Sequence, residues 1–123
     1  VHEGLLEAAH LLAQGGQLLA QAARDQRPVM LDFYADWCTS CKEMERFTFA
    51  DASVKDKLQR FVLLRADVTA NSQEDRALLR RFGIFGPPST IFYGADGKLK
   101  TERVVGYKPA PAFLSTLQRT YPS

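Results

Sequence analysis

The sequence predicts an α/β domain in which helices flank a central, mixed β-sheet. Strand-like and helix-like segments alternate along most of the chain, a pattern typical of parallel strands joined by right-handed crossovers. Two strand-like segments near the C-terminal end are separated by a short turn, which predicts a hairpin of antiparallel strands. The length of 123 residues fits a single domain with one hydrophobic core.

The first part of the chain predicts helix and then a buried strand. Residues 1–14 are rich in Leu and Ala and favour either a short helix or a strand around 10–13. Residues 16–25 carry an apolar stripe at helical spacing, and Pro28 ends this helix. Residues 29–34 form a run of β-formers interrupted by a single acid, as in a strand that is buried on both faces.

The middle of the chain predicts two further helices around a second strand. Residues 38–49 have the composition of a helix, and 52–60 continue as a second helical piece. A strand follows over 61–68. Ser72 then begins a capping box, which predicts a helix that Gly83 closes.

The C-terminal third predicts the hairpin and a last helix. An irregular segment at 86–88 precedes the hairpin because it contains two consecutive prolines. The expected strands are 89–93 and 99–105 around the turn 94–97, and the expected helix runs from Pro109 or Pro111 through Leu117.

Composition excludes several classes of function. The apolar fraction of 46% and charged fraction of 24% are ordinary for a folded domain and exclude a disordered or low-complexity chain. The formal net charge of +2 does not indicate nucleic acid or an anionic membrane as the partner. No apolar run approaches the ~20 residues that cross a bilayer.

The chain contains only two cysteines, Cys38 and Cys41. Two thiols are too few for a disulfide-stapled miniprotein. A structural zinc site normally has four ligands, and the two histidines, His2 and His10, lie far along the chain from the cysteines. We therefore expect no metal site, and the function of the two cysteines must be one that two thiols can perform together.

The two cysteines follow directly on a predicted buried strand, at the start of a predicted helix. A helix N-terminus favours the thiolate, which is the nucleophile of disulfide exchange. Cys41 is one helical turn further on, close enough to attack a mixed disulfide on Cys38. The spacing predicts a two-step exchange with Cys38 as nucleophile and Cys41 as resolving thiol. The alternative, a stray thiol pair or half a metal site, is disfavoured by the missing ligands.

Two acids are candidates to tune the thiols. Asp32 lies in the middle of a buried strand, where desolvation raises a carboxyl pKa and suits a proton acceptor for the resolving thiol. Its alternative is an exposed strand position. Glu45 lies four residues after Cys41, on the same helical face as both thiols, where its charge would perturb their ionisation. Its alternative is a solvated helix glutamate.

Two further features are candidates for binding a partner. Trp37 precedes the nucleophile and offers an apolar surface for a protein partner, although a core aromatic is an equal alternative. Pro87 and Pro88 precede a strand, where a cis X-Pro bond would be a deliberate feature of a tight turn. The alternative is two trans prolines in a plain connection.

These residues resemble the thioredoxin family. The run 32–42, DFYADWCTSCK, is similar to its signature D-F-[WY]-A-x-W-C-x-x-C-K, and 86–88 resembles its cis-proline segment, with Pro88 in the cis-proline place. Over 27–117 the chain is more similar to one member group, the C-terminal domain of the thiol:disulfide interchange proteins called DsbD. The stretches that carry this resemblance are 28–38, 42–45, 48–49 and 66–71.

The resemblance implies a thioredoxin fold over residues 1–123, with 1–15 as an N-terminal extension, cut from a longer membrane protein that faces the bacterial periplasm. It implies a protein-disulfide reductase that binds no cofactor and whose electrons, ultimately from NADPH, come from the DsbD membrane domain. The acceptor would be the DsbD N-terminal domain, which leads to disulfide isomerases and cytochrome c maturation. It also implies a Cys38–Cys41 disulfide and a Cys38 pKa that is held high by Asp32 and Glu45.

Partner-binding residues are expected next to the cysteines, between them, and in the proline segment. They are Trp37, Thr39, Ser40, Pro87 and Pro88. Thr39 and Ser40 replace the Gly-Pro of thioredoxin, and Pro87 has no N–H to donate to a partner strand. The family's first strand is not evident before Gly15. The competing interpretations are a stand-alone thioredoxin-like reductase in cytochrome c assembly and a binding module with a permanent disulfide. The isolated domain is expected to be a monomer.

Overall fold

The computed structural model describes residues 5–122, with side chains from Gly16 onward. Its centre is a five-stranded sheet of order β1-β3-β2-β4-β5. β1, β3 and β2 run parallel, whereas β4 is antiparallel to both β2 and β5. The sheet is therefore mixed, as predicted. Its strands are β1 (Leu5–Glu7), β2 (Val29–Tyr34), β3 (Val62–Asp67), β4 (Ser89–Tyr93) and β5 (Leu99–Val105).

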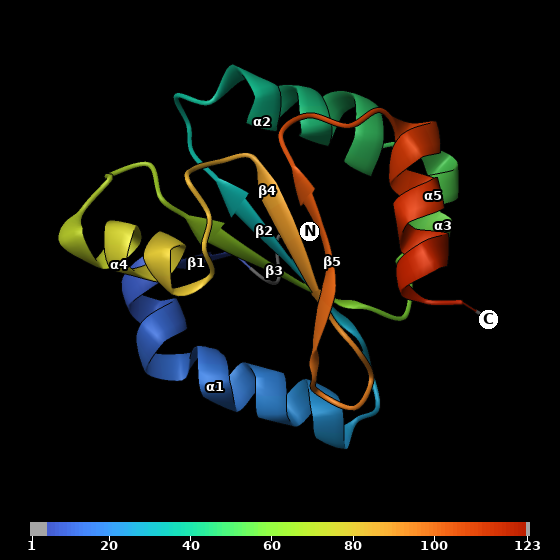
Figure 1. The fold of residues 1–123 in the computed structure, drawn as a ribbon, viewed down its shortest axis with the longest axis horizontal. Coiled ribbons are helices and arrows are strands. Elements are labelled where there is room, and N and C mark those ends of the chain that lie inside the picture. Colours follow the sequence, from blue (N-terminus) through green and yellow to red (C-terminus); the bar gives the residue numbers. More distant parts are fainter. Residues whose placement is uncertain (1–4, 123) are drawn as a thin grey trace.

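Helices cover both faces of this sheet. α1 and α4 lie on one face, and α2, α3 and α5 lie on the other (Figure 1). The π-helix η2 continues directly from α2 along the same face. The bounds are α1 (Ala8–Arg24), α2 (Thr39–Glu43), η2 (Met44–Phe49), α3 (Ala52–Lys57), α4 (Gln73–Arg81) and α5 (Ala110–Thr120).

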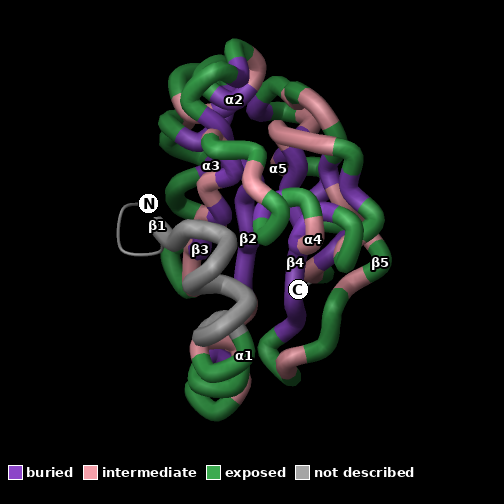
Figure 2. Tube along the Cα trace, turned by 90° about the vertical axis from the view of Figure 1, so that its left-hand side faces the viewer, coloured by how far each residue is buried: buried purple, intermediate pink, exposed green. Residues whose placement is uncertain are grey.

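The alternation of side chains along β2 divides the core into two layers. β2 and β4 are buried along their whole length (Figure 2). Val29, Leu31 and Phe33 pack into the cluster that contains side chains of α1 and α4. Met30, on the opposite face, packs into the cluster that contains side chains of η2, α3 and α5. Asp32 is two residues after Met30, so its side chain extends to the same face of the sheet, which α2 and η2 cover.

The N-terminal part of the fold differs from the sequence expectation. The predicted helix 16–25 is the second half of a longer α1 that begins at Ala8, so residues 10–13 are helical and the alternative of a strand there is wrong. A first strand does exist before Gly15, at Leu5–Glu7, where it pairs with β3. A strand of three residues is too short to show a hydrophobic periodicity in the sequence. It forms by pairing with the edge of β3, which exists only in the folded protein.

The remaining elements follow the prediction, with one change of helix type. The predicted helix 38–49 is α2 followed by the π-helix η2. The predicted helix 52–60 is α3, which ends at Lys57. The Ser72 hydroxyl and the Asp75 carboxylate form the expected capping box of α4. The hairpin β4–β5 is also present, and Pro109 is the N-cap of α5.

Candidate active site

The cysteine pair lies where β2 passes into α2. β2 ends at Tyr34, and Cys38 is the N-cap of α2, with an extended backbone (φ −92°, ψ 103°). The backbone N–H of Cys41 donates to the Cys38 sulfur at 3.1 Å. The two cysteines form a disulfide, with their Cα atoms 5.2 Å apart. The predicted position of the pair at the start of a helix is confirmed.

Both cysteines are largely covered by protein. Cys38 is 7% exposed and Cys41 is 3% exposed. A partner disulfide must therefore approach closely to reach Cys38, and Cys41 is the more deeply placed of the two. The roles of Cys38 as nucleophile and Cys41 as resolving thiol stay predictions.

Asp32 is buried in the middle of β2. Its residue is 5% exposed, so the alternative of an exposed strand position is wrong. It lies opposite Arg65 of β3 in the parallel register and opposite Thr90 of β4. The Asp32 pKa is raised from 3.8 to about 7: burial is the main cause, the positive charge of Arg65 opposes it, and the charge of Glu45 adds to it. A carboxyl that changes charge near neutral pH can both accept and return a proton.

Glu45 lies in the first turn of η2 and contacts Arg65. An Arg65 Nη2–H group donates to Glu45 Oε1. The Glu45 side chain is 39% exposed, so the carboxylate is partly solvated and partly paired. The π-helix η2 begins at Met44, one residue before Glu45, and the placement of Glu45 on the helical face of both thiols is a prediction. Its influence on the thiols stays a prediction.

Arg65 is the charged group that sequence reasoning missed. Its side chain is 11% exposed and makes ion pairs with both Asp32 and Glu45, the former at 3.4 Å from Nε to Oδ2. Its guanidinium also stacks on the ring of Tyr34 at 4.3 Å. The only signal in the sequence was a lone Arg inside a predicted strand. Its meaning depended on the β2–β3 register, which the sequence did not reveal.

A cis peptide bond joins Pro87 to Pro88, directly before β4. The alternative of two trans prolines is therefore wrong. The Pro88 carbonyl accepts a hydrogen bond from the N–H of Gly106 at 2.9 Å. Gly106 has a φ of +80°, a conformation that favours glycine, and it directly follows β5. The Pro88 segment and the end of β5 are therefore tied together.

Exposed aromatic side chains lie near these segments in the sequence. Trp37 is 60% exposed, so the alternative of a core aromatic is wrong, and its indole N–H donates to the Thr69 carbonyl at 2.9 Å. Phe85 is fully exposed three residues before Pro88, and sequence reasoning missed it. Of the other expected binding residues, Thr39 is exposed, whereas Ser40, Pro87 and Pro88 are half-buried.

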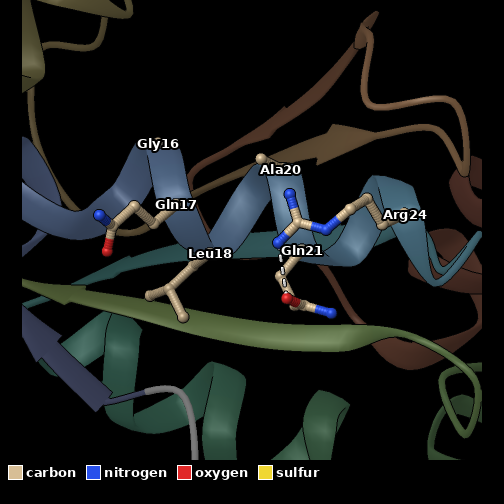
Figure 3. A pocket seen from close by; sticks show the side chains of 6 residues that line it. All are labelled: Gly16, Gln17, Leu18, Ala20, Gln21 and Arg24. Atoms are coloured by element: carbon tan, nitrogen blue, oxygen red, sulfur yellow. Dashed lines mark hydrogen bonds between the residues drawn. The ribbon is translucent and has the colours of Figure 1, made fainter.

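Other features of the described residues do not point to a second chemistry. Among the side chains of residues 16–122, no cluster of His, Cys, Asp and Glu has the arrangement of a metal site. Within residues 5–122, no helix is long and apolar enough to span a membrane. A surface hollow of about 580 Å³ lies along α1, with Leu18 pointing toward the sheet (Figure 3). It is on the sheet face opposite α2, and the cysteines do not line it.

Residues 16–120 match the profile of the thioredoxin-like domain family. The chain belongs to this family. The thioredoxin fold, with its mixed sheet and its redox pair at the start of a helix, is confirmed. The thioredoxin-like domain spans most of the chain, so the sequence resemblance and the geometry agree.

Relatives and solved structures narrow the type of thioredoxin-like domain. The thiol:disulfide interchange protein DsbD of Ralstonia nicotianae is 62% identical over 93 residues, which cover 76% of this chain but only 15% of that protein. The oxidised DsbD C-terminal domain of Neisseria meningitidis is 36% identical, with a TM-score of 0.76 over 89% of this chain and 96% of that one. Its reduced form is 34% identical, with a TM-score of 0.76 over 94% of this chain and 100% of that one.

These likenesses identify a thiol:disulfide interchange domain of the DsbD C-terminal type. Its redox group is the Cys38–Cys41 disulfide. The Neisseria domain is known in both oxidised and reduced forms. The chain spans less than a fifth of the length of the curated DsbD relatives that it matches.

Proposed function

We propose that this chain is the protein-disulfide reductase domain of a DsbD-type membrane protein. It receives an electron pair from a membrane-embedded domain and passes it to disulfides of periplasmic partners. The observation that carries the proposal is the Cys38–Cys41 pair at the start of α2, with the buried carboxyl of Asp32 on the β2 strand that leads into it. A permanent structural bridge needs neither a helix N-terminus nor a nearby acid.

The first step is attack on the partner. In the reduced domain the Cys38 thiolate attacks one sulfur of the partner disulfide, and a mixed disulfide forms while the partner's other sulfur leaves as a thiolate. Because Cys38 is the N-cap of α2, the N–H of Cys41 points at its sulfur and stabilises its negative charge. Asp32 and Glu45 oppose this effect through their charge and keep the free domain less reactive.

The second step releases the partner. The Cys41 thiol gives its proton to the Asp32 carboxylate, and the resulting thiolate attacks the Cys38 sulfur. The Cys38–Cys41 disulfide forms, the mixed disulfide breaks, and the partner's second sulfur leaves as a thiolate. The partner's two thiolates take up two protons, one that Cys41 gave to Asp32 and one that Cys38 released to solvent when it ionised. Overall the reduced domain loses two electrons and two protons, and the partner gains them. The membrane-embedded domain reverses this step to reduce Cys38–Cys41 again.

Exposed apolar side chains on the segments around Cys38, Pro88 and Gly106 support a protein partner rather than a small substrate. Trp37 and Phe85 are among the most exposed large apolar side chains of the described residues, and Val105 and Tyr107 flank Gly106. Gly106 in turn binds the Pro88 carbonyl. Exposed aromatic residues are enriched where protein partners dock. We propose that the partner contacts these side chains together with Thr39 and Ser40.

The place of the domain in the cell follows from the same proposal. As part of a DsbD-type protein it faces the periplasm at the bacterial inner membrane. Its first acceptor is the N-terminal domain of the same protein, and its electrons come from NADPH through other proteins. A stand-alone reductase of cytochrome c assembly is the second candidate, because the fold and the cysteine pair fit it equally well.

Trapping of the mixed disulfide tests the function. A Cys41→Ala variant lacks the resolving thiol, so it should accumulate a covalent complex with an oxidised DsbD N-terminal domain. The complex is read on a non-reducing gel and must disappear with dithiothreitol. A Cys38→Ala variant is the matched control and should trap nothing.

The result also separates the alternatives. A wild-type domain that reduces the N-terminal domain supports the DsbD-type function. Trapping of cytochrome c assembly proteins without the N-terminal domain favours the stand-alone reductase. A wild-type disulfide that no partner reduces, together with a Cys38→Ser variant that loses only stability, overturns the proposal in favour of a structural bridge.

A further inference from the structure

The connection between β5 and α5 is anchored at both of its ends. Gly106 directly follows β5, and its N–H donates to the Pro88 carbonyl at 2.9 Å. Two residues later, both backbone polar groups of Lys108 bind side chains of η2, beside which the connection passes in Figure 1. Tyr107 lies between these two anchors, and its side chain is exposed. The segment 106–108 is therefore held on one side by the proline segment and on the other by η2.

Two side chains of η2 make the contacts to Lys108. The Thr48 hydroxyl donates to the Lys108 carbonyl at 2.6 Å, and the Met44 sulfur accepts from the Lys108 N–H at 3.3 Å. Both side chains are buried, Thr48 completely. A backbone group that leaves water without a hydrogen-bond partner is costly. Thr48 and Met44 therefore give this connection the partners that a helix or a sheet would otherwise provide.

The Thr48 hydroxyl is used differently from those of the other buried threonines in helices. Thr116 and Thr120 of α5 are buried too, yet each donates to the carbonyl four residues earlier in its own helix. Such a local bond is common for a threonine inside a helix. Thr48 instead reaches a residue 60 positions away. Its hydroxyl fixes a distant connection against the helix and does not serve the helix itself.

Met44 also links this contact to the redox pair. Its backbone N–H donates to the Cys41 carbonyl, where α2 passes into η2. A chain of contacts therefore runs from Cys41 through Met44 to Lys108. π-Helical turns that continue an α-helix are frequent at functional sites. The same turn of helix thus supports both the cysteine pair and the exposed segment 106–108.

We propose that Thr48 and Met44 are positioning residues that hold the segment 106–108 in the conformation to which a protein partner docks. The inference rests on the proposed function, in which the partner contacts Val105 and Tyr107. A segment that is already ordered loses less conformational entropy on docking, so the partner binds more tightly. Thr48 and Met44 do not touch the partner themselves, because both are buried. Their loss weakens docking and leaves the chemistry at the cysteines intact.

The concentration dependence of electron transfer tests this role. Reduced domain in increasing excess is mixed with oxidised DsbD N-terminal domain, the reaction is quenched with acid, and free thiols are labelled with a maleimide that shifts the band on a gel. The observed rate should saturate, which gives a half-saturation concentration for docking and a limiting rate for the exchange. Thr48→Val keeps the shape of the side chain without its hydroxyl. It should raise the half-saturation concentration about fivefold, as expected for one lost hydrogen bond, and change the limiting rate less than about twofold.

Three further variants separate positioning from stability. Thr48→Ser keeps the hydroxyl but loses a buried methyl group, so it should lower the unfolding midpoint and leave the half-saturation concentration unchanged. Thr120→Val removes a buried hydroxyl that binds within α5, and as the matched control it should have the same two effects. Met44→Leu removes only the weaker sulfur acceptor and should raise the half-saturation concentration about twofold.

Amide hydrogen exchange measures directly whether the segment is held. The Gly106 N–H is bound to the Pro88 carbonyl, so it exchanges when the segment opens. Its exchange should be several times faster in Thr48→Val than in the wild type, whereas Thr120→Val should leave it unchanged. An exchange rate that is the same in Thr48→Val and the wild type would contradict the positioning role.

The proposal is overturned if Thr48→Val leaves the half-saturation concentration in place or lowers only the limiting rate. It is also overturned if Thr48→Ser or Thr120→Val raises the half-saturation concentration as much. If Thr48→Val does not fold, Met44→Leu decides, and an unchanged half-saturation concentration in that variant refutes the role. A wild type that does not reduce the DsbD N-terminal domain refutes the proposed function instead, and the Gly106 exchange rate then decides whether Thr48 holds the segment.

Discussion

Replacement of Asp32 by Asn should stabilise the folded protein at neutral pH. The folded state holds the Asp32 carboxyl at a pKa of about 7, against 3.8 for an ordinary one. The folded state therefore binds more protons than the unfolded state between these values, so stability falls as the pH rises through this window. About three pKa units at about 1.4 kcal/mol each give a cost of about 4 kcal/mol once the carboxyl is ionised.

Asn keeps the shape of Asp but carries no charge, so it removes this cost. About 4 kcal/mol is an upper bound at pH 8, because Asp32→Asn also leaves Arg65 with one counter-ion fewer. At pH 5 the wild-type carboxyl is mostly protonated in the folded state, and the advantage of the variant should shrink by about 2.5 kcal/mol. This change with pH is a sharper test than the absolute value.

Urea unfolding of the oxidised proteins between pH 5 and pH 8 measures the difference. The disulfide is intact in both, so it cancels in the comparison. Asp56→Asn, which alters an exposed carboxyl of α3, is the matched control and should show little pH-dependent difference from wild type. An advantage of Asp32→Asn that is flat across this range would refute a raised Asp32 pKa, and with it the role of Asp32 as a proton acceptor near neutral pH.

Two further changes test the acid beside the helix and the docking surface. Glu45→Gln should lower the Cys38 pKa, because it removes a negative charge near the thiol. The pH dependence of alkylation by iodoacetamide in the reduced protein measures this pKa. An unchanged Cys38 pKa would contradict the influence of Glu45. Phe85→Ala should weaken reduction of a protein partner severalfold and leave reduction of a small disulfide unchanged. Leu99→Ala, at the other end of β5 from Gly106, should affect neither reaction, and equal losses in the two variants would refute a docking role for Phe85.

The position of the redox pair could be predicted because it depends on local signals. A run of β-formers ends at Tyr34, and helix-forming residues follow Cys38, so the strand-to-helix junction can be read from neighbouring residues. Burial of Asp32 could be predicted for the same reason, since apolar residues surround it on both sides. These features need no knowledge of which strands pair.

The features that were missed depend on contacts between distant segments. Arg65 lies 33 positions after Asp32, and only the β2–β3 register brings the two together. β1 is three residues long and exists through its pairing with β3. The π-helix η2 was missed because its composition does not distinguish it from an ordinary helix. Trp37 was ambiguous because an aromatic residue suits a core and a binding surface equally.

The exposure of Trp37 gives the protein an internal optical reporter. It is the only tryptophan in the chain, it directly precedes Cys38, and a hydrogen bond to the Thr69 carbonyl holds its indole. Tryptophan emission therefore arises from one side chain next to the redox pair. Oxidation of the cysteines and the arrival of a partner both change the surroundings of that indole. Electron transfer and docking can thus be followed by fluorescence in the unlabelled protein, with no change to the chain.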